Sequence, residues 1–312
     1  MAKLLFAAVL ALLLSLGVGL YLPKWLQFML TMAMANGLVS LGLVILMRGG
    51  VVAFGQGLMS ALGGYTAALL FQHLSLTDAV ALPLLGGVSA MLITAPFAPL
   101  LARYRGIFFS MLTLALSMVG YGLMVKTESL GGSDGFNMGR VTVAGQALAD
   151  EWVSYTLYAV TLCFAVLASV WAKVYVASTR GLVTRAIRDN ELRVEYMGGS
   201  VAQTMAINFV LAAFLAGMGG ALAVMALGHI DPNFSYWTTS GEYVFVAILA
   251  GSQSVLAVML SSAVLEVVRS FSSAYFPTTW QFALGLFLLL VIRFLPQGLG
   301  SLWRSKPPKD PS

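Results

Sequence analysis

Charged residues are scarce in this chain. Only 9% of its 312 residues are Asp, Glu, Lys or Arg, whereas 59% are hydrophobic and the mean hydropathy is +0.90. A water-soluble domain carries about 25% charged residues. An aqueous core cannot hide so much apolar surface, so the composition excludes a soluble fold. It indicates a chain solvated by lipid, in which a spanning helix needs roughly 20 apolar residues.

Residues that carry common chemistry are also few. The single cysteine, Cys163, can form no disulfide within the chain. The histidines His73 and His229 show no metal-binding spacing, and the ATP-binding pattern G-x-x-x-x-G-K-[ST] does not occur. Carboxylates inside apolar segments are limited to Glu242 and Glu266. We therefore expect no catalytic residue, metal or cofactor in this chain.

What the chain does contain is a series of apolar segments along its whole length. With 32 glycines, they suit helices that pack closely or break inside a membrane. We predict an all-α fold, a polytopic transmembrane helical bundle of about 9–10 membrane segments that include broken or half helices. The segments are 4–21, 25–47, 51–71, 79–101, 106–125, 152–172, 203–227, 241–251, 254–271 and 280–296.

Two of these segments differ from a simple membrane-spanning helix. The first follows Lys3 and resembles a signal peptide, but it is long and lacks a clear cleavage site, so a first membrane helix is favoured. The segment 241–251 is too short to span, and 251–254 separates it from the next. We predict a half-helix there, or a helix broken inside the membrane.

The basic residues predict the orientation of the bundle. With a cytoplasmic N-terminus, 13 of the 17 Lys and Arg residues lie on the cytoplasmic side, and only Lys24, Lys126 and Arg140 lie clearly outside. Both termini are then cytoplasmic. The net charge of +5 comes mainly from short loops between apolar segments, so we expect no nucleic-acid partner.

This orientation gives a simple domain plan. Residues 1–300 form one transmembrane domain, with a periplasmic loop at about 126–151 and a cytoplasmic loop at about 173–200. The proline-rich tail 301–312 is predicted to be disordered in the cytoplasm.

The cytoplasmic loop holds the most informative stretch, GLVTRAIRDNELRVEYMG at 181–198. On a helix, Leu182, Ala186 and Asn190 share one side. Charges of the two signs are equal in number between 185 and 195. Such an amphipathic helix suits docking into a groove on a partner protein. The alternative is a helix that rests on lipid headgroups.

Four stretches carry motifs in a fixed order. The first is GGVVAFGQGLMSALGGYTAALL at 49–70, and the second is the loop segment at 181–198. The third is FLAGMGGALA at 214–223, and the fourth combines LAGSQS at 249–254 with FLPQGL at 294–299. In this order they resemble the permease subunits of the branched-chain amino acid ABC importer family. Urea and short-chain amide permeases share the same ordered motifs.

The resemblance implies a multi-pass transport subunit of a bacterial inner membrane, without an ATPase site of its own. Its partners would be a second homologous permease, two cytosolic ABC ATPases that bind ATP and Mg²⁺, and a periplasmic solute-binding protein. The expected cargo is a branched-chain amino acid or a related small polar solute. The residues expected to couple it to the ATPase are Arg185, Ala186, Ile187, Arg188, Asp189, Asn190 and Glu191.

Two breaks are candidates for the translocation path. Broken helices expose backbone polar groups, which are tolerated only where they face protein or water. Gly55, Gln56 and Gly57 form the first break, and Ser252 and Gln253 belong to the second. The alternative is that these glycines allow close helix packing.

Other polar and small residues in the spans predict packing contacts. Asn36 and Asn208 are lone amides in apolar segments and predict hydrogen bonds between helices. Glu266 and Arg269 are spaced i, i+3, which predicts a mutual ion pair. The stripes Ser60–Gly64–Ala68 and Ala213–Gly217–Ala221 predict close-packed helix faces.

Two other functional classes are weighed against the importer. An ion-coupled secondary transporter needs ion-coordinating carboxylates in its spans, and these are scarce here. A membrane-embedded enzyme acting on lipid-linked substrates needs a catalytic cluster at one membrane face. Neither class accounts for the segment at 181–198.

Overall fold

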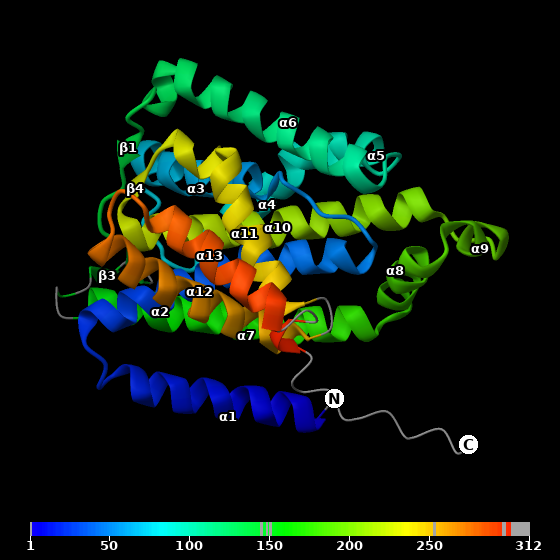
Figure 1. The fold of residues 1–312 in the computed structure, drawn as a ribbon. Coiled ribbons are helices and arrows are strands. Elements are labelled where there is room, and N and C mark those ends of the chain that lie inside the picture. Colours follow the sequence, from blue (N-terminus) through cyan, green and yellow to red (C-terminus); the bar gives the residue numbers. More distant parts are fainter. Residues whose placement is uncertain are drawn as a thin grey trace.

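The computed structural model describes residues 2–143, 146–147, 149, 152–251, 254–294 and 298–300. They form an all-α bundle (Figure 1), and each of the ten predicted apolar segments contains a helix. Six helical stretches of the described chain are long and apolar enough to cross a membrane: Lys24–Arg48, Ala81–Leu101, Gly106–Lys126, Val153–Ala177, Val201–Leu227 and Val255–Tyr275. The chain is a multi-pass membrane protein, as predicted.

The first helices of the chain follow one another with short connections. The first half of the chain forms α1 (Ala2–Gly19), α2 (Lys24–Arg48), α3 (Gln56–Leu74), α4 (Ala81–Thr94), α5 (Ala98–Leu101) and α6 (Gly106–Lys126). A 3₁₀ turn, η1 (Ala95–Phe97), joins α4 to α5, and a second, η2 (Glu128–Leu130), follows α6. Pro96 lies in η1, where its missing N–H interrupts the regular helix.

The second half of the chain has the same character. It forms α7 (Val153–Ala177), α8 (Thr179–Asp189), α9 (Glu191–Tyr196), α10 (Val201–Leu227), the 3₁₀ turn η3 (Pro232–Ser235), α11 (Trp237–Ala250), α12 (Val255–Tyr275) and α13 (Trp280–Phe294). The predicted half-helix at 241–251 is α11, whose 14 residues span about 21 Å. It ends at Gly251, which has a φ of +71°.

The helices α2 and α10 form the centre of the bundle. The protein buries 83% of the most apolar stretch of α2 and 72% of that of α10, against 22% for α6. The exposed side chains of α6 are large and apolar, among them Ile107, Phe108 and Met111. This pattern leaves α6 with an exposed apolar face at the surface of the bundle and places α2 and α10 inside it.

Glycines let α3 and α4 approach the central helix α10. A Cβ atom at Gly63 would collide with the backbone of Gly217, and one at Gly220 with the backbone of Ser60. A Cβ at Gly217 would lie 2.6 Å from the Gly86 carbonyl oxygen of α4. The predicted packing role of the Gly217 stripe is therefore confirmed, with α3 and α4 sharing one face of α10.

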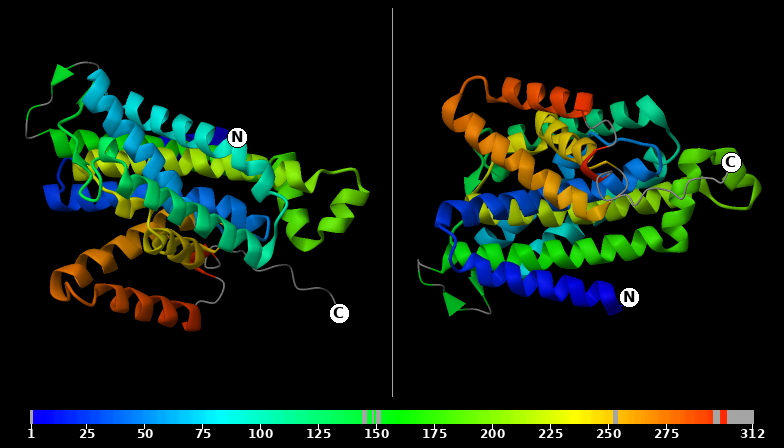
Figure 2. Two further views of the ribbon diagram at one scale, coloured as in Figure 1. Left: turned by 90° about the horizontal axis from the view of Figure 1, so that it is seen from above. Right: turned by 60° about the horizontal axis from the view of Figure 1, so that its bottom comes forward.

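Connections alternate between the two ends of the bundle. The start of α1, the α2–α3 connection, the α5–α6 turn and the helices α8 and α9 lie at one end, and α8 and α9 project beyond it (Figures 1 and 2). This end carries most of the described basic residues, including Arg48, Arg103, Arg105, Lys173, Arg180, Arg185, Arg188 and Arg193. By the positive-inside rule we predict that it faces the cytoplasm.

Short strands lie at the opposite end of the bundle. β1 (Phe136–Asn137) pairs antiparallel with β4 (His229–Ile230), so the 126–151 loop is joined to the segment after α10. β2 (Thr142–Val143) pairs with β3 (Gln146–Ala147). Within this loop, Thr142 O accepts a hydrogen bond from Ala79 N at 2.8 Å, which ties the loop to the α3–α4 connection. The tail 301–312 lies outside the described residues.

Replacing Gly63 by alanine tests the close approach of α3 to α10. The new Cβ would collide with the backbone of Gly217, so we expect the free energy of unfolding to fall by about 1–3 kcal/mol. Gly122→Ala is the matched control, since a Cβ there meets no atom within 4 Å. Thermal melting of both variants in the same detergent makes the comparison. Equal melting temperatures would show that the two helices are not in close contact.

Candidate functional site

The α3 helix begins inside the bundle instead of at its end. The preceding residues 51–55 are not helical and run along α6. Ser110 Oγ donates to Val52 O at 2.7 Å, and Phe54 N donates to Thr113 Oγ1 at 3.0 Å. Side chains of α6 thus satisfy backbone groups that a broken helix leaves open. The break that the sequence predicts around Gln56 is present, at the start of α3.

Another break, at residues 232–236, lies inside the bundle and is reached from the opposite end. The turn η3 follows β4 and packs against α3 and α6, and α11 starts directly after it. Ser117 Oγ, halfway along α6, donates to Ser235 O at 2.7 Å, and Ser235 Oγ donates to Ser117 O at 3.1 Å. Both serines are fully buried. The sequence had indicated only a short outer loop at 228–240, so this re-entrant turn was missed.

The first turns of α3 and α11 meet at a shared boundary, which we call the half-helix seam (residues 55–60 and 235–243). Gly57 N donates to Ser240 Oγ at 2.9 Å, and one turn further Ser60 Oγ and Tyr243 Oη lie 3.3 Å apart. Position 57 must be glycine for this approach, because a Cβ there would lie 2.7 Å from Ser240 Oγ. Two helix N-termini therefore lie side by side within the bundle.

Gln56, the first residue of α3, is the unusual side chain of the seam. It is completely buried, and neither its Oε1 nor its Nε2 has a hydrogen-bond partner in the described protein. An unsatisfied buried polar group costs about 1–3 kcal/mol, and an amide carries two of them. Such a cost in a native structure indicates a water, a ligand or a second state that supplies the missing bonds.

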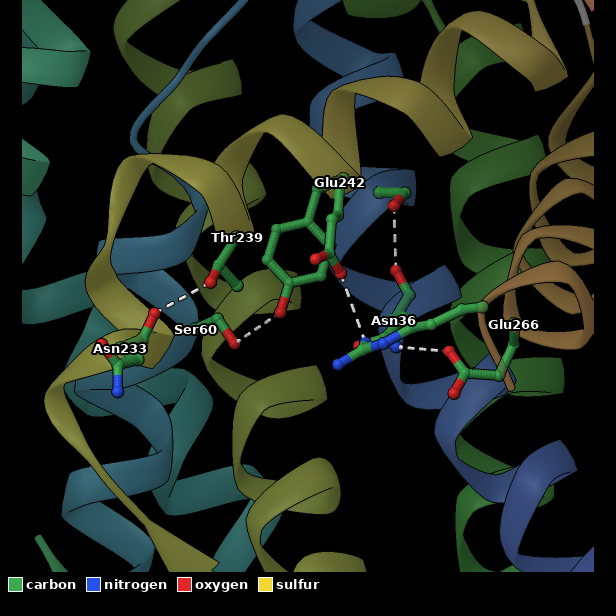
Figure 3. A network of polar contacts seen from close by, with 9 residues as sticks. Asn36, Ser60, Asn233, Thr239, Glu242 and Glu266 are labelled. Atoms are coloured by element: carbon green, nitrogen blue, oxygen red, sulfur yellow. Dashed lines mark hydrogen bonds and ion pairs between the residues drawn. The ribbon is translucent and has the colours of Figure 1, made fainter. Parts of the chain in front are cut away.

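A cluster of charged side chains lies beside the seam (Figure 3). Arg269 Nη1 of α12 lies 3.3 Å from Glu242 Oε2 of α11, and Asn36 Nδ2 of α2 donates to Glu266 Oε2 at 3.2 Å. The guanidinium of Arg269 also stands 5.5 Å from the ring centre of Trp280. Glu242 thus pairs with a cation and Glu266 with an amide among apolar helices, where ionisable groups are costly and usually have a function.

The cluster corrects one predicted contact and confirms another. The described ion pair of Arg269 is with Glu242, not with Glu266, because α11 brings a second carboxylate to the guanidinium. The two lone amides form hydrogen bonds between helices, as predicted. Asn36 bonds Glu266, and Asn208 Nδ2 donates to Thr184 Oγ1 at 2.9 Å.

The segment at 181–198 forms two short helices instead of one. Ser178 caps α8, accepting from Gly181 N at 3.4 Å, and Asn190 caps α9, accepting from Arg193 N at 2.9 Å. Asn190 itself is extended, with φ −164° and ψ 104°, and this ends α8. The pair α8–α9 is therefore a bent hairpin beyond the end of α7 and α10.

Three contacts attach this hairpin to the bundle. Ile187 is 1% exposed and packs in the main apolar core. Asn208 of α10 bonds Thr184 and accepts from Tyr175 Oη of α7 at 2.6 Å. Arg105 Nε, at the start of α6, lies 2.7 Å from Glu191 Oε1. The hairpin is thus tied to α6, α7 and α10.

The seven residues expected to couple to an ATPase therefore divide into two groups. Ile187 faces the bundle, and Glu191 is held by Arg105. The other five present exposed side chains on the projecting hairpin: Arg185, Ala186, Arg188, Asp189 and Asn190. Of the path candidates, Gly55, Gln56 and Gly57 lie at the seam. Ser252 and Gln253 lie outside the described residues.

Comparison with known proteins decides the family. Residues 25–293 match the family model described as "Branched-chain amino acid transport system / permease component". The chain belongs to this permease family. The match includes the seam, the charged cluster and the α8–α9 hairpin.

Curated relatives of the permease carry two names. The permease is 27% identical over 292 residues to LivM of Salmonella typhimurium, a "High-affinity branched-chain amino acid transport system permease protein". The matched region covers 86% of this chain and 68% of that one. LivM of Escherichia coli K12 is 26% identical with the same coverage. LivH of Salmonella typhimurium is 26% identical over 146 residues, 46% of this chain and 47% of that one. No solved structure matches the permease significantly.

The described part of the permease has no cluster of potential metal-ligating side chains. No group of three or more His, Cys, Asp or Glu side chains lies close enough there to hold an ion. That ATP and Mg²⁺ bind only to partner ATPases stays a prediction. The arrangement that the permease does present is a buried polar seam, a neighbouring charged cluster, and a projecting hairpin.

Replacing Arg269 by leucine tests the charged cluster. Glu242 would lose its ion partner among apolar helices, but 37% of the Arg269 side chain is exposed, so we expect a destabilisation of about 1–2 kcal/mol. The double variant Arg269→Leu/Glu242→Leu removes both charges and should recover most of that loss. Thermal melting of the two variants gives the answer. A double variant that is no more stable than the single one would contradict the pairing.

Proposed function

We propose that this chain is the permease subunit of an ABC importer in a bacterial inner membrane. It forms the path for branched-chain amino acids or related small polar solutes. Two cytosolic ATPases bind ATP and Mg²⁺ and drive the cycle, and a periplasmic solute-binding protein delivers the solute. Membership of the permease family and the similarity to LivM support this proposal.

The α8–α9 hairpin is the observation that carries the proposal. It projects from the basic end of the bundle (Figure 2) and exposes Arg185, Arg188 and Asp189. At the same time it is fixed to α6, α7 and α10 by the Arg105–Glu191 and Asn208–Thr184 contacts. A partner that moves this hairpin would displace three helices together. This combination of exposed charge and firm attachment suits an ATPase-coupling element.

The second permease would be a homologous chain of the LivH kind. LivM and LivH both occur in Salmonella typhimurium and in Escherichia coli K12. This chain resembles LivM along most of its length and LivH along about half. That pattern supports a heteromeric pair, with this chain as the LivM-like member.

The half-helix seam is the proposed translocation path. The N-terminal end of a helix carries a partial positive charge, and two such ends meet here. They suit the carboxylate of an amino acid better than neutral urea or an amide. The unpartnered amide of Gln56 supplies one donor group and one acceptor group for a passing solute. Gly55 and Gly57 allow the close approach of Thr113 and Ser240 there, and Ser252 and Gln253 remain predicted path residues.

The charged cluster gives little support to an ion-coupled transporter. Both intramembrane carboxylates already have partners, Glu242 in Arg269 and Glu266 in Asn36. An ion-binding site would first have to break these contacts.

Alanine at Arg185, Arg188 and Asp189 tests the coupling role. We expect the parent chain, purified intact in mild detergent, to bring down an ABC ATPase and a second permease. The amount of ATPase that co-purifies with the variant should fall at least tenfold, while the amount of the second permease stays the same. Quantitative mass spectrometry measures both amounts. Arg103→Ala is the matched control, an exposed arginine at the same end but off the hairpin.

Two outcomes would contradict this role. A variant that retains the ATPase would show that the exposed hairpin charges are not the contact. A parent chain that purifies without any ATPase under several conditions would contradict the importer itself, and uptake driven by an ion gradient would then be measured.

Replacing Gln56 by leucine tests the path. Its amide has no partner to lose, so we expect stability to be unchanged or higher while uptake of radiolabelled leucine falls at least tenfold. Gln27→Leu is the matched control. Gln27 is also buried, but its Nε2 donates to the carbonyls of Gly19 and Leu22, at 3.0 and 3.2 Å. It should lose stability instead. Normal uptake by the Gln56 variant would exclude Gln56 from the path.

A further inference from the structure

A separate cavity opens between α1, α2, α7 and α12. Its volume is about 450 Å³, within the roughly 300–1,000 Å³ that is typical of small-molecule sites. Its walls are mostly aliphatic side chains and methionines, including Met34, Leu162 and Met259. None of its lining residues belongs to the half-helix seam or to the charged cluster.

The hydrogen bonds that join α1 to α7 in the described structure lie toward its C-terminus. Near its C-terminus, Tyr158 Oη donates to Ser15 O at 3.1 Å and Tyr155 Oη donates to Leu16 O at 3.2 Å. Toward its N-terminus, α1 presents Ala7, Ala8 and Ala11 to the cavity. These side chains are too short to fill the space toward α2 and α12.

The two charged residues that line the cavity are both basic. Arg48 ends α2, and Lys173 lies in the last turns of α7, so both stand at the end that we predict to be cytoplasmic. No carboxylate is among the described lining residues. The lining of α7 extends from Leu162 to Val176, about 20 Å along a helix, and the hydrocarbon of one leaflet is about 15 Å deep.

We propose that this cavity binds an anionic phospholipid from the cytoplasmic leaflet. The acyl chain lies along the apolar walls, and the phosphodiester lies between Arg48 and Lys173. A zwitterionic amino acid finds no carboxylate for its ammonium group among the described lining residues. A free inorganic anion could use the two cations but not the long apolar channel. A lipid satisfies both parts of the site at once.

The test is native mass spectrometry of the full-length chain, with whatever subunits stay bound. The protein is transferred into nanodiscs that contain equal amounts of phosphatidylglycerol and phosphatidylcholine. It is then released from the nanodiscs inside the mass spectrometer. We expect one phosphatidylglycerol to be retained in preference to phosphatidylcholine. Lys173→Gln should lower that retention about fivefold, the change that corresponds to ~1 kcal/mol for one basic residue near a membrane surface. Arg103→Gln, at the same end but outside the cavity, should leave it unchanged.

A second pair of variants tests the apolar part. Ala8→Phe fills the cavity and should abolish retention of the lipid, whereas Val9→Phe, on the exposed side of α1, should not. Equal retention of both lipids, or lipid binding that survives both Lys173→Gln and Ala8→Phe, would overturn the proposal and show ordinary boundary lipid. Retention of inorganic phosphate in place of lipid would also overturn it. Unchanged melting of Ala8→Phe would show that the loss is not due to unfolding.

Discussion

A peptide group without a hydrogen-bond partner inside a membrane costs several kcal/mol, and the architecture of this permease follows from that constraint. Breaks lie within the bundle before α3 and before α11. Both breaks lie against α6, whose Ser110, Thr113 and Ser117 bond the open backbone. The opposite side of α6 is apolar and exposed. One helix therefore covers two irregular segments.

The helix α11 links the two polar regions of the bundle. Its first turns carry Ser240 and Tyr243 toward α3, while Glu242 reaches Arg269 on α12. A displacement of α11 would therefore disturb the seam and the ion pair together. The helix α10 has a similar linking role. It packs closely on α3 and α4, and through Asn208 it also holds the α8–α9 hairpin.

Hydropathy and glycine positions were enough to predict the ten apolar segments that contain helices and the break at Gln56, since both depend on local composition. The turn at 232–235 was missed because its polar residues read as a surface loop. Only the distant partner Ser117 shows that Ser235 is buried. The spacing of Glu266 and Arg269 predicted a pair, but spacing along one helix cannot reveal a competitor such as Glu242. Ile187 was placed in the coupling set, although its apolar character suits the buried position that it occupies.

The seam can be completed only late in the synthesis of the protein. The two residues of its Gly57–Ser240 hydrogen bond are separated by 183 positions. At a synthesis rate of about 5–20 residues per second, α11 emerges roughly 10–40 s after the start of α3. During that interval the nascent α3 has no partner for the Gly57 amide on α11. Membrane insertion of the first half must therefore tolerate a polar surface whose partner has not yet been made.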